Sequence, residues 1–162
     1  MKKLLVILMI ITTSLTHTAC FSQDEPEEKG VNIDSANYRA QWDESYEYDI
    51  PIEINDYASF ENFLNNHPQQ DMEIEDLLKK FNEDFFNENL LYAYIKSEPS
   101  GSNKLEADKA IIENGTLILK MSRYVPEIGT ADMAARVCIF AIERDTLNQV
   151  STVIANIADE EW

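Results

Sequence analysis

Two runs of this chain are apolar at almost every position, and they constrain the fold more than any other feature. The runs are residues 90–96, "LLYAYIK", and residues 136–143, "RVCIFAIE". Successive side chains of a strand point to opposite faces of its sheet, so both faces of these segments are apolar. Each run therefore predicts a strand in the centre of a sheet.

Residues 105–122, "LEADKAIIENGTLILKMS", predict a β-hairpin. Asn114 and Gly115 tolerate the positive φ angles that a two-residue turn needs at both of its central positions. Residues 31–42 predict a first strand and residues 150–157 a last one.

The segment 46–55, "YEYDIPIEIN", alternates strictly between apolar and mostly acidic residues. This pattern predicts a strand over 46–54 with an apolar inner face and a wet, acidic outer face. Pro51 has no N–H for a sheet ladder, which places the strand at an edge. Charges and a proline also protect an edge from aggregation, so the pattern needs no ligand; contact with a partner is the alternative.

Two helices are expected between these strands. Residues 59–66 predict a short helix with Ser59 as its N-cap. Residues 72–87, which Asp71 can cap, carry one apolar stripe formed by Ile74, Leu77, Leu78, Phe81 and Phe85. The fold class is therefore α+β, with one or two helices packed on a mainly antiparallel sheet of about five or six strands, in a single domain over 31–162.

The N-terminus reads as an export signal over residues 1–19. Lys2 and Lys3 precede the apolar run 4–11, and a more polar stretch then leads to Cys20. The apolar run is too short to cross a hydrocarbon core of ~30 Å as a helix.

The end of this signal, "THTAC" at 16–20, resembles the lipobox of bacterial lipoproteins. There a cysteine follows two small residues, here Thr18 and Ala19, and becomes the lipidated first residue. The resemblance implies lipid attachment at Cys20 and a location on the cell membrane, facing outside the cytoplasm. Two acyl chains on one cysteine give stable anchoring. Ordinary signal-peptide cleavage, which gives a secreted protein, is the alternative.

Residues 20–30 are then the lipidated cysteine and an acidic tether. The chain has a formal net charge of −17, which excludes nucleic acid binding through phosphates, because that requires clustered Lys and Arg. The acidity serves solubility or, as the alternative, a basic partner or a cation. Cys20 and Cys138 are the two cysteines, so no disulfide framework is expected.

Catalytic groups are scarce. His67 is the one histidine after the signal, and we expect it at the surface. Cys138 lies in an apolar strand, where a buried thiol has a raised pKa and is unreactive. We expect no enzyme and no cofactor; two carboxylates in a cleft are the remaining enzymatic alternative.

Six residues are candidates for binding a partner. They lie in or beside two loops that flank the central strands and are Ser100, Ser102, Arg123, Glu127, Thr130 and Asp132. Arg123 is expected to pair with Glu127 or Asp132. Alternatively, Glu127, Thr130 and Asp132 only bind backbone amides of their own loop. Four acids form a weaker calcium candidate, Asp43, Glu44, Glu47 and Asp49, which suits a solvated edge equally well.

Three segments of the body resemble known families: "FNEDFFNENLLYAYIKSEPSGS" (81–102), "IIENGTLILKMSR" (111–123) and "VPEIGTADMAARVCIFAIE" (125–143). They are similar to an uncharacterised domain of secreted and lipid-anchored proteins in clostridium-like bacteria. More distantly, they resemble the C-terminal domain of PrcB-type lipoproteins, which stabilise a surface protease complex. The second resemblance implies a partner protein and no catalysis. The expected function is a lipid-anchored, extracytoplasmic, non-enzymatic module that binds or stabilises another protein, with a small-ligand or Ca²⁺-binding domain as the alternative.

Overall fold

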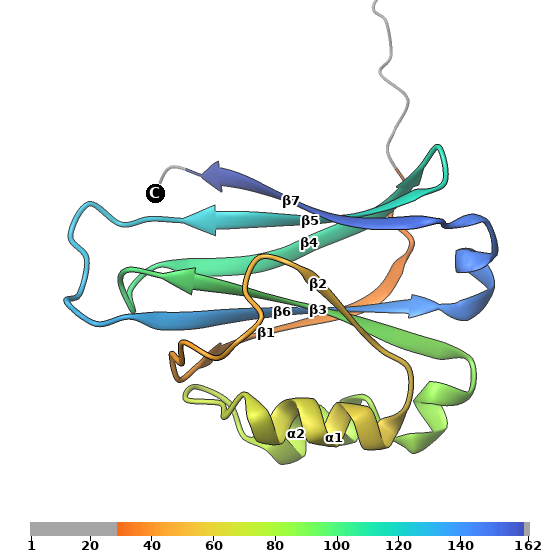
Figure 1. Ribbon diagram of the computed structural model, residues 1–162, viewed down its shortest axis with the longest axis horizontal. Coiled ribbons are helices and arrows are strands. Elements are labelled where there is room, and N and C mark those ends of the chain that lie inside the picture. The colour runs from red at the N-terminus through yellow and green to blue at the C-terminus, as the bar shows by residue number, and fades with distance from the viewer. Residues whose placement is uncertain (1–28, 161–162) are drawn as a thin grey trace, which may run out of the picture.

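Seven strands divide into two stacked sheets in the computed structural model, which describes residues 29–160 (Figure 1). Sheet A has the strand order β1-β6-β3-β2, and sheet B has the order β4-β5-β7. The strands are β1 (Asn32–Ala40), β2 (Pro51–Ile54), β3 (Asn89–Glu98), β4 (Lys104–Glu113), β5 (Thr116–Tyr124), β6 (Ala134–Glu143) and β7 (Thr152–Glu160). Neighbouring strands are antiparallel except for β5 and β7, which run parallel.

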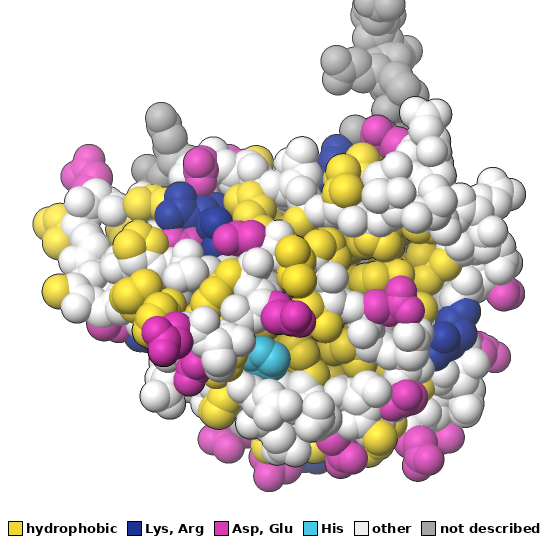
Figure 2. Space-filling view, viewed as in Figure 1, with side chains coloured by type: hydrophobic (Ala, Val, Ile, Leu, Met, Phe, Trp, Pro, Cys, Tyr) yellow, Lys and Arg dark blue, Asp and Glu magenta, His cyan; other side chains and the backbone are white. Residues whose placement is uncertain are grey.

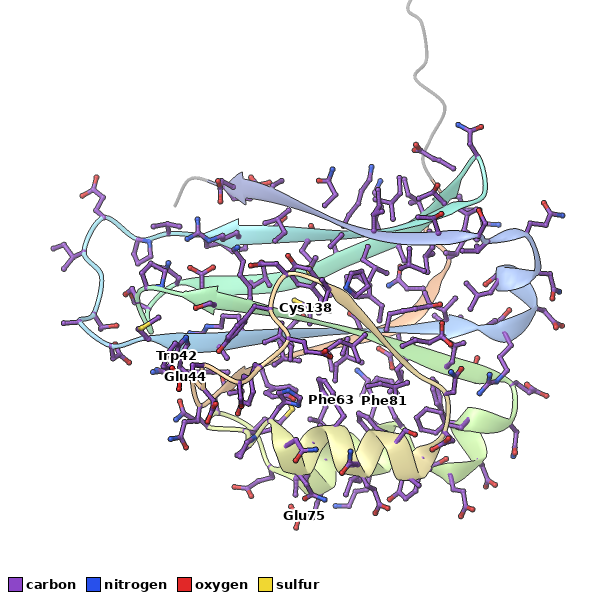
Figure 3. All side chains as sticks on the ribbon, in the orientation of Figure 1. Trp42, Glu44, Phe63, Glu75, Phe81 and Cys138 are labelled. Atoms are coloured by element: carbon purple, nitrogen blue, oxygen red, sulfur yellow. The ribbon has the colours of Figure 1, made fainter. Side chains whose placement is uncertain are left out.

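The helices cover the face of sheet A that sheet B leaves open (Figure 1). They are α1 (Tyr57–Asn66), α2 (Ile74–Lys80) and the 3-10 helix η1 (Glu83–Asn87). A second 3-10 helix, η2 (Arg144–Gln149), joins β6 to β7 at one end of the sheets. Phe63 and Phe81 lie between the helices and sheet A, whereas Cys138 lies between the sheets and Glu75 points away from the body (Figure 3). The single α+β domain with helices packed on mainly antiparallel strands is confirmed, but it has two sheets instead of one.

This layering explains the two runs that are apolar on both faces. β3 and β6 are the inner strands of sheet A, as predicted. Ile139 is fully buried in the cluster beneath the helices, and its neighbour Phe140 is fully buried in the cluster beneath sheet B. A strand in the middle layer meets a core on each side, so it needs apolar residues at successive positions.

The Asn114-Gly115 hairpin is confirmed. It joins β4 to β5, and its two central residues have φ angles of 49° and 76°. Both lie in the left-handed region that a two-residue hairpin turn requires and that asparagine and glycine accept at low cost.

The predicted edge strand is shorter than the alternation suggested. β2 does lie at an edge of sheet A, but it begins only at Pro51. Asp49 has a φ of 62°, which breaks the extended backbone before the strand begins. The side chains of Tyr46 and Tyr48 still pack against the core on the helix side, whereas Ile50 is exposed.

The acidic face of this segment is also less free than expected. Glu53 accepts a hydrogen bond of 2.8 Å from the Tyr92 hydroxyl, and Asp49 accepts one of 3.0 Å from the Tyr94 hydroxyl. Burial, followed by these hydrogen bonds to carboxylates, raises the pKa of both tyrosines. Two acids of the predicted outer face therefore bind the hydroxyl groups of tyrosines whose rings belong to the core between the sheets.

The prediction of one continuous helix over 72–87 was wrong. α2 ends at Lys80, and η1 restarts after Asn82, whose side chain accepts a 3.0 Å hydrogen bond from the Phe85 amide. Asp71 does not cap α2 and instead accepts a 2.8 Å bond from the Arg39 amide. Phe81 is nevertheless core, as the stripe predicted.

The N-cap of α1 is also corrected. Asp56 occupies that position and accepts a 2.7 Å bond from the Ser59 amide, so Ser59 lies within the helix.

The export signal over 1–19, Cys20 and residues 21–28 of the tether lie outside the described residues. Within 29–160, no helix combines the length and the apolar character that crossing a membrane requires.

Candidate functional site

Two loops meet at one end of the two sheets, and they contain five of the six candidate residues. The first joins β3 to β4 over residues 99–103, and the second joins β5 to β6 over 125–133. Ser100 Oγ lies 2.8 Å from Ser102 Oγ and accepts a 2.8 Å bond from the Thr130 amide. Thr130 Oγ1 in turn accepts a 3.1 Å bond from the Ser102 amide. The Ser100 and Thr130 hydroxyls therefore hold the two loops together, because each accepts a hydrogen bond from a backbone amide of the other loop.

Glycine makes this close approach possible. A β-carbon on Gly101 would lie 2.3 Å from Oδ2 of Asp132 and 2.7 Å from Nη2 of Arg39. A β-carbon on Gly129 would lie 2.9 Å from Ser100 Oγ. A β-carbon at either position would therefore fit only if the neighbouring side chain moved.

Asp132 fixes the end of the second loop to sheet A. Its Oδ2 lies 2.5 Å from Nη2 of Arg39, near the end of β1. Hydrogen bonding by the Thr130 side chain, and then by the Arg39 guanidinium, holds the pKa of Asp132 below its ordinary value. Thr130 and Asp132 thus bind the neighbouring loop and β1, which goes beyond the expectation that they serve only their own loop.

The expected pairing of Arg123 with Glu127 or Asp132 was wrong. Arg123 binds Glu98 at two points, Nε to Oε1 at 2.6 Å and Nη2 to Oε2 at 2.8 Å. The Glu98 side chain is fully buried, and its Oε2 also accepts a 2.6 Å bond from the Asn103 side chain. Asp159 on β7 lies 3.1 Å from Nη1 of Arg123. Hydrogen bonding with Glu98 raises the pKa of Arg123, so this arginine is a structural anchor beneath the loops.

The outer part of the second loop is apolar and exposed. Val125 and Met133, at its two ends, are 45% and 48% exposed, and Ile128 at its tip is 87% exposed. Hydrophobic side chains gather at the left end of the molecule in Figure 2, where Figure 1 places the turn from β5 to β6. Glu127 lies beside Ile128 and is exposed as well. The loop therefore presents an apolar tip on a base that hydrogen bonds and an ion pair hold in place.

Sequence reasoning missed a row of cations beneath the same loops. Arg39, Arg136 and Lys96 lie directly opposite one another on β1, β6 and β3. Residues in this register share one face of a sheet. Arg136 donates a 2.6 Å hydrogen bond to the Gly101 carbonyl, which ties the first loop to the sheet. A charged residue at the margin of an apolar run, such as Arg136 before "VCIFAI", is a signal that could have pointed to this row.

The cation row borders a cleft of about 430 Å³, whose charged lining is Arg39, Asp71, Lys104, Glu106 and Arg136. Burial lowers the pKa of Arg136, and the Asp71 carboxylate, 3.7 Å from its Nη1, opposes that shift. Asp71 therefore offsets the charge of Arg136 in this cleft, next to the loop that Arg136 binds.

The four acids of the calcium candidate do not converge. Asp43 Oδ1 accepts bonds of 2.6 Å and 2.8 Å from the Ser45 hydroxyl and amide, which lower its pKa. Asp49 instead pairs with Lys96 at 3.3 Å, and Glu44 and Glu47 are exposed. Across residues 29–160, no group of three or more His, Cys, Asp and Glu side chains is arranged to hold a metal ion.

The two other reactive residues differ in burial. The thiol of Cys138 is fully buried and its pKa is raised well above the ordinary value by burial, as predicted. His67 is half-buried, which corrects its expected surface position: its ring centroid lies 4.4 Å from that of Tyr46 and 4.3 Å from that of Phe63. Its Nδ1 donates a 2.7 Å hydrogen bond to the Phe63 carbonyl.

Comparison with known proteins gives no relative: no family model matches the chain, and neither a curated protein nor a solved structure matches it.

Proposed function

We propose that this protein is a lipid-anchored, extracytoplasmic, non-enzymatic domain that binds or stabilises a partner protein through the loop 125–133. The observation that carries the proposal is Ile128, a large apolar residue that is 87% exposed at the tip of a loop with a fixed base. Leaving such a side chain in water forgoes its burial energy, of about 1.5–3 kcal/mol. A partner with an apolar pocket recovers that energy.

The fixed base supports the same conclusion. The Ser100–Thr130 hydrogen bonds and the Asp132–Arg39 pair order the loop before any partner arrives. A loop that is ordered beforehand loses less conformational entropy on binding, so more of the contact energy appears as affinity. Glu127, exposed beside Ile128, is placed to meet a polar or basic rim around that pocket.

The anchor is the second part of the proposal. The lipobox-like "THTAC" at 16–20 and the acidic tether that follows Cys20 support attachment to a membrane surface at a distance set by the tether. A membrane protein or another envelope protein is then the expected partner.

The test is cross-linking and affinity capture from the native membrane with three proteins: the wild type, Ile128→Ser and Ile33→Ser. Ile33 is the matched control because it is 50% exposed on β1 and lies outside the loops. We expect one surface protein to be captured by the wild type and Ile33→Ser, and lost with Ile128→Ser, while all three melt at the same temperature. Capture that survives Ile128→Ser, or that both substitutions remove, would overturn the assignment of the loop.

A further inference from the structure

The free edge of β7 differs from the other three strand edges of the molecule. An edge strand carries unpaired N–H and C=O groups that pair readily with another chain, so proteins normally protect such edges. β1 is bound at two points of its edge: the Gln70 amide donates a 2.8 Å bond to the Arg39 carbonyl, and Lys80 donates a 2.6 Å bond to the Ser35 carbonyl. β2 is only four residues long and begins with Pro51.

The edge of β4 is protected by side chains from sheet A and by the segment before β1. Asn37 and Asn32 each accept a 2.8 Å hydrogen bond, from the amides of Ala107 and Ala110 respectively. Val31 donates a 2.6 Å bond to the Ala110 carbonyl. A bulge between Ala107 and Lys109 further interrupts this edge.

β7 has none of these protections among the residues that the structure describes. It is nine residues long, contains no proline, lysine or arginine, and has its two acids, Asp159 and Glu160, only at its end. Its backbone bonds go to β5 on one side, and no hydrogen bond from residues 29–160 reaches the backbone of its other side. In a parallel pair, successive residues direct their N–H and C=O groups to opposite sides, so about half of these groups are unpaired.

The side chains of β7 are also incompletely covered. Val153, Ala155 and Ile157 face the core between the sheets but are only half-buried, and Ile154 on the other face is 43% exposed. Ile154 continues an apolar row with Ile118 and Ile111 across sheet B. A further strand beside β7 would extend both faces and cover these residues.

We infer that β7 accepts an extended segment of another protein as a fourth strand of sheet B, and that this segment is apolar in its centre and basic at its ends. The basic ends follow from charge. Glu160 and Asp159 lie at one end of β7, where Asp159 is 74% exposed although it also pairs with Arg123. Glu53, which also binds the Tyr92 hydroxyl, shares a surface hollow with Thr152 and Val153 at the other end. A second copy of this chain, with its own formal charge of −17, is repelled as the occupant.

This surface is separate from the loop 125–133 but adjoins it. β5 and β7 are parallel, with Tyr124 opposite Glu160, so β7 ends where the loop begins (Figure 1). One partner can therefore occupy both surfaces, although the inference about β7 stands on its own contacts.

The test uses proline and two synthetic peptides of the length of β7. One peptide alternates threonine and valine with a lysine at each end, and its matched control has glutamate at each end. Ala155→Pro and Asn156→Pro are made in parallel, because only one of these neighbours donates its N–H to β5. Proline at the residue that bonds β5 removes a hydrogen bond of the sheet and should lower the melting temperature. The variant that melts like the wild type is therefore the one that changes the free edge, and we call it the edge-blocking variant.

We expect the wild type to bind the lysine peptide at least about tenfold more tightly than the glutamate peptide. The edge-blocking variant should bind the lysine peptide at least about tenfold more weakly than the wild type does. Hydrogen exchange on the wild type should show slowing at alternate amides of β7 when the lysine peptide is added, a readout that needs no variant. Ile128→Ser should leave this binding unchanged, which separates the inference from the proposed role of the loop.

Three results would overturn the inference. The first is no binding of the lysine peptide at about 1 mM, and the second is equal binding to the edge-blocking variant. The third is a dimer of the wild type, seen by sedimentation, whose alternate β7 amides are already protected without peptide. That last result would make a second copy of the chain the occupant.

Discussion

Arg123 and Glu98 form a two-point ion pair in which the carboxylate is fully buried and the guanidinium is 20% exposed. Removing one partner of a buried pair leaves the other charge without compensation, which typically costs about 3–5 kcal/mol. We therefore expect Arg123→Met to lower the free energy of unfolding by about that amount, measured by urea denaturation.

The control for this prediction is the double variant Glu98→Gln with Arg123→Met, which has no buried charge at the site. It should be more stable than Arg123→Met alone. A loss of less than about 1 kcal/mol in Arg123→Met would show that the pair carries little of the stability.

Gly101→Ala should loosen the junction of the two loops. The added methyl group would meet Asp132 and Arg39 at distances that force one of them to move, at a cost of about 1–3 kcal/mol. Urea denaturation of Gly101→Ala, Asp132→Ala and the double variant measures this. If the clash is the cause, Gly101→Ala should cost clearly less in the Asp132→Ala background. Equal costs in both backgrounds would point to another origin.

His67 makes stability depend on pH near neutrality. Burial lowers its pKa below the ordinary value of 6.5, so the unfolded chain binds more protons than the folded one as the pH falls. The stability from neutral His67 is present above pH 6.5 and is lost as the pH falls through the folded pKa. Urea denaturation at about pH 7.5 and about pH 5.5 should show a larger loss for the wild type than for His67→Gln. Equal losses would contradict this role of His67.

Cys20 is expected to carry the lipid. Growth with radiolabelled palmitate should label the wild type and leave Cys20→Ala unlabelled, because the thioether and the new N-terminus both depend on that residue. Cys138→Ala is the control and should keep the label, since the Cys138 thiol is fully buried. Label on Cys20→Ala would contradict lipid attachment at Cys20, and an unlabelled wild type would favour a secreted protein.

Local signals in the sequence predicted the local parts of the fold. Asn114-Gly115 specifies its own turn, and the apolar runs of β3 and β6 specify inner strands. The alternation at 46–54 predicted the start of β2 less well, because alternating burial can also arise in a turn. Tyr46 and Tyr48 meet the core from a turn as well as they would from a strand. The break after Lys80 was hidden because Phe81 and Phe85 reach the core both in one long helix and in two short ones.

The candidate site was predicted only as far as its loops. The approach of Ser100 and Thr130 follows from where β3, β5 and β6 begin and end, and those positions were close to the prediction. The partner of Arg123 depends on the parallel pairing of β5 with β7 and on the stacking of Glu98 beneath β5. Such contacts join residues far apart in the chain, and thirty acids offer many equally plausible partners.

The position of β6 between β1 and β3 also determines when the protein can fold. β1 ends at Ala40, yet the strand beside it begins only at Ala134, so sheet A cannot close until most of the chain has left the ribosome. Pairing over so long a separation is intrinsically slow, because the loop between the strands must close before any contact is gained. The local β4–β5 hairpin can form earlier, so sheet B has its first two strands before sheet A has its centre.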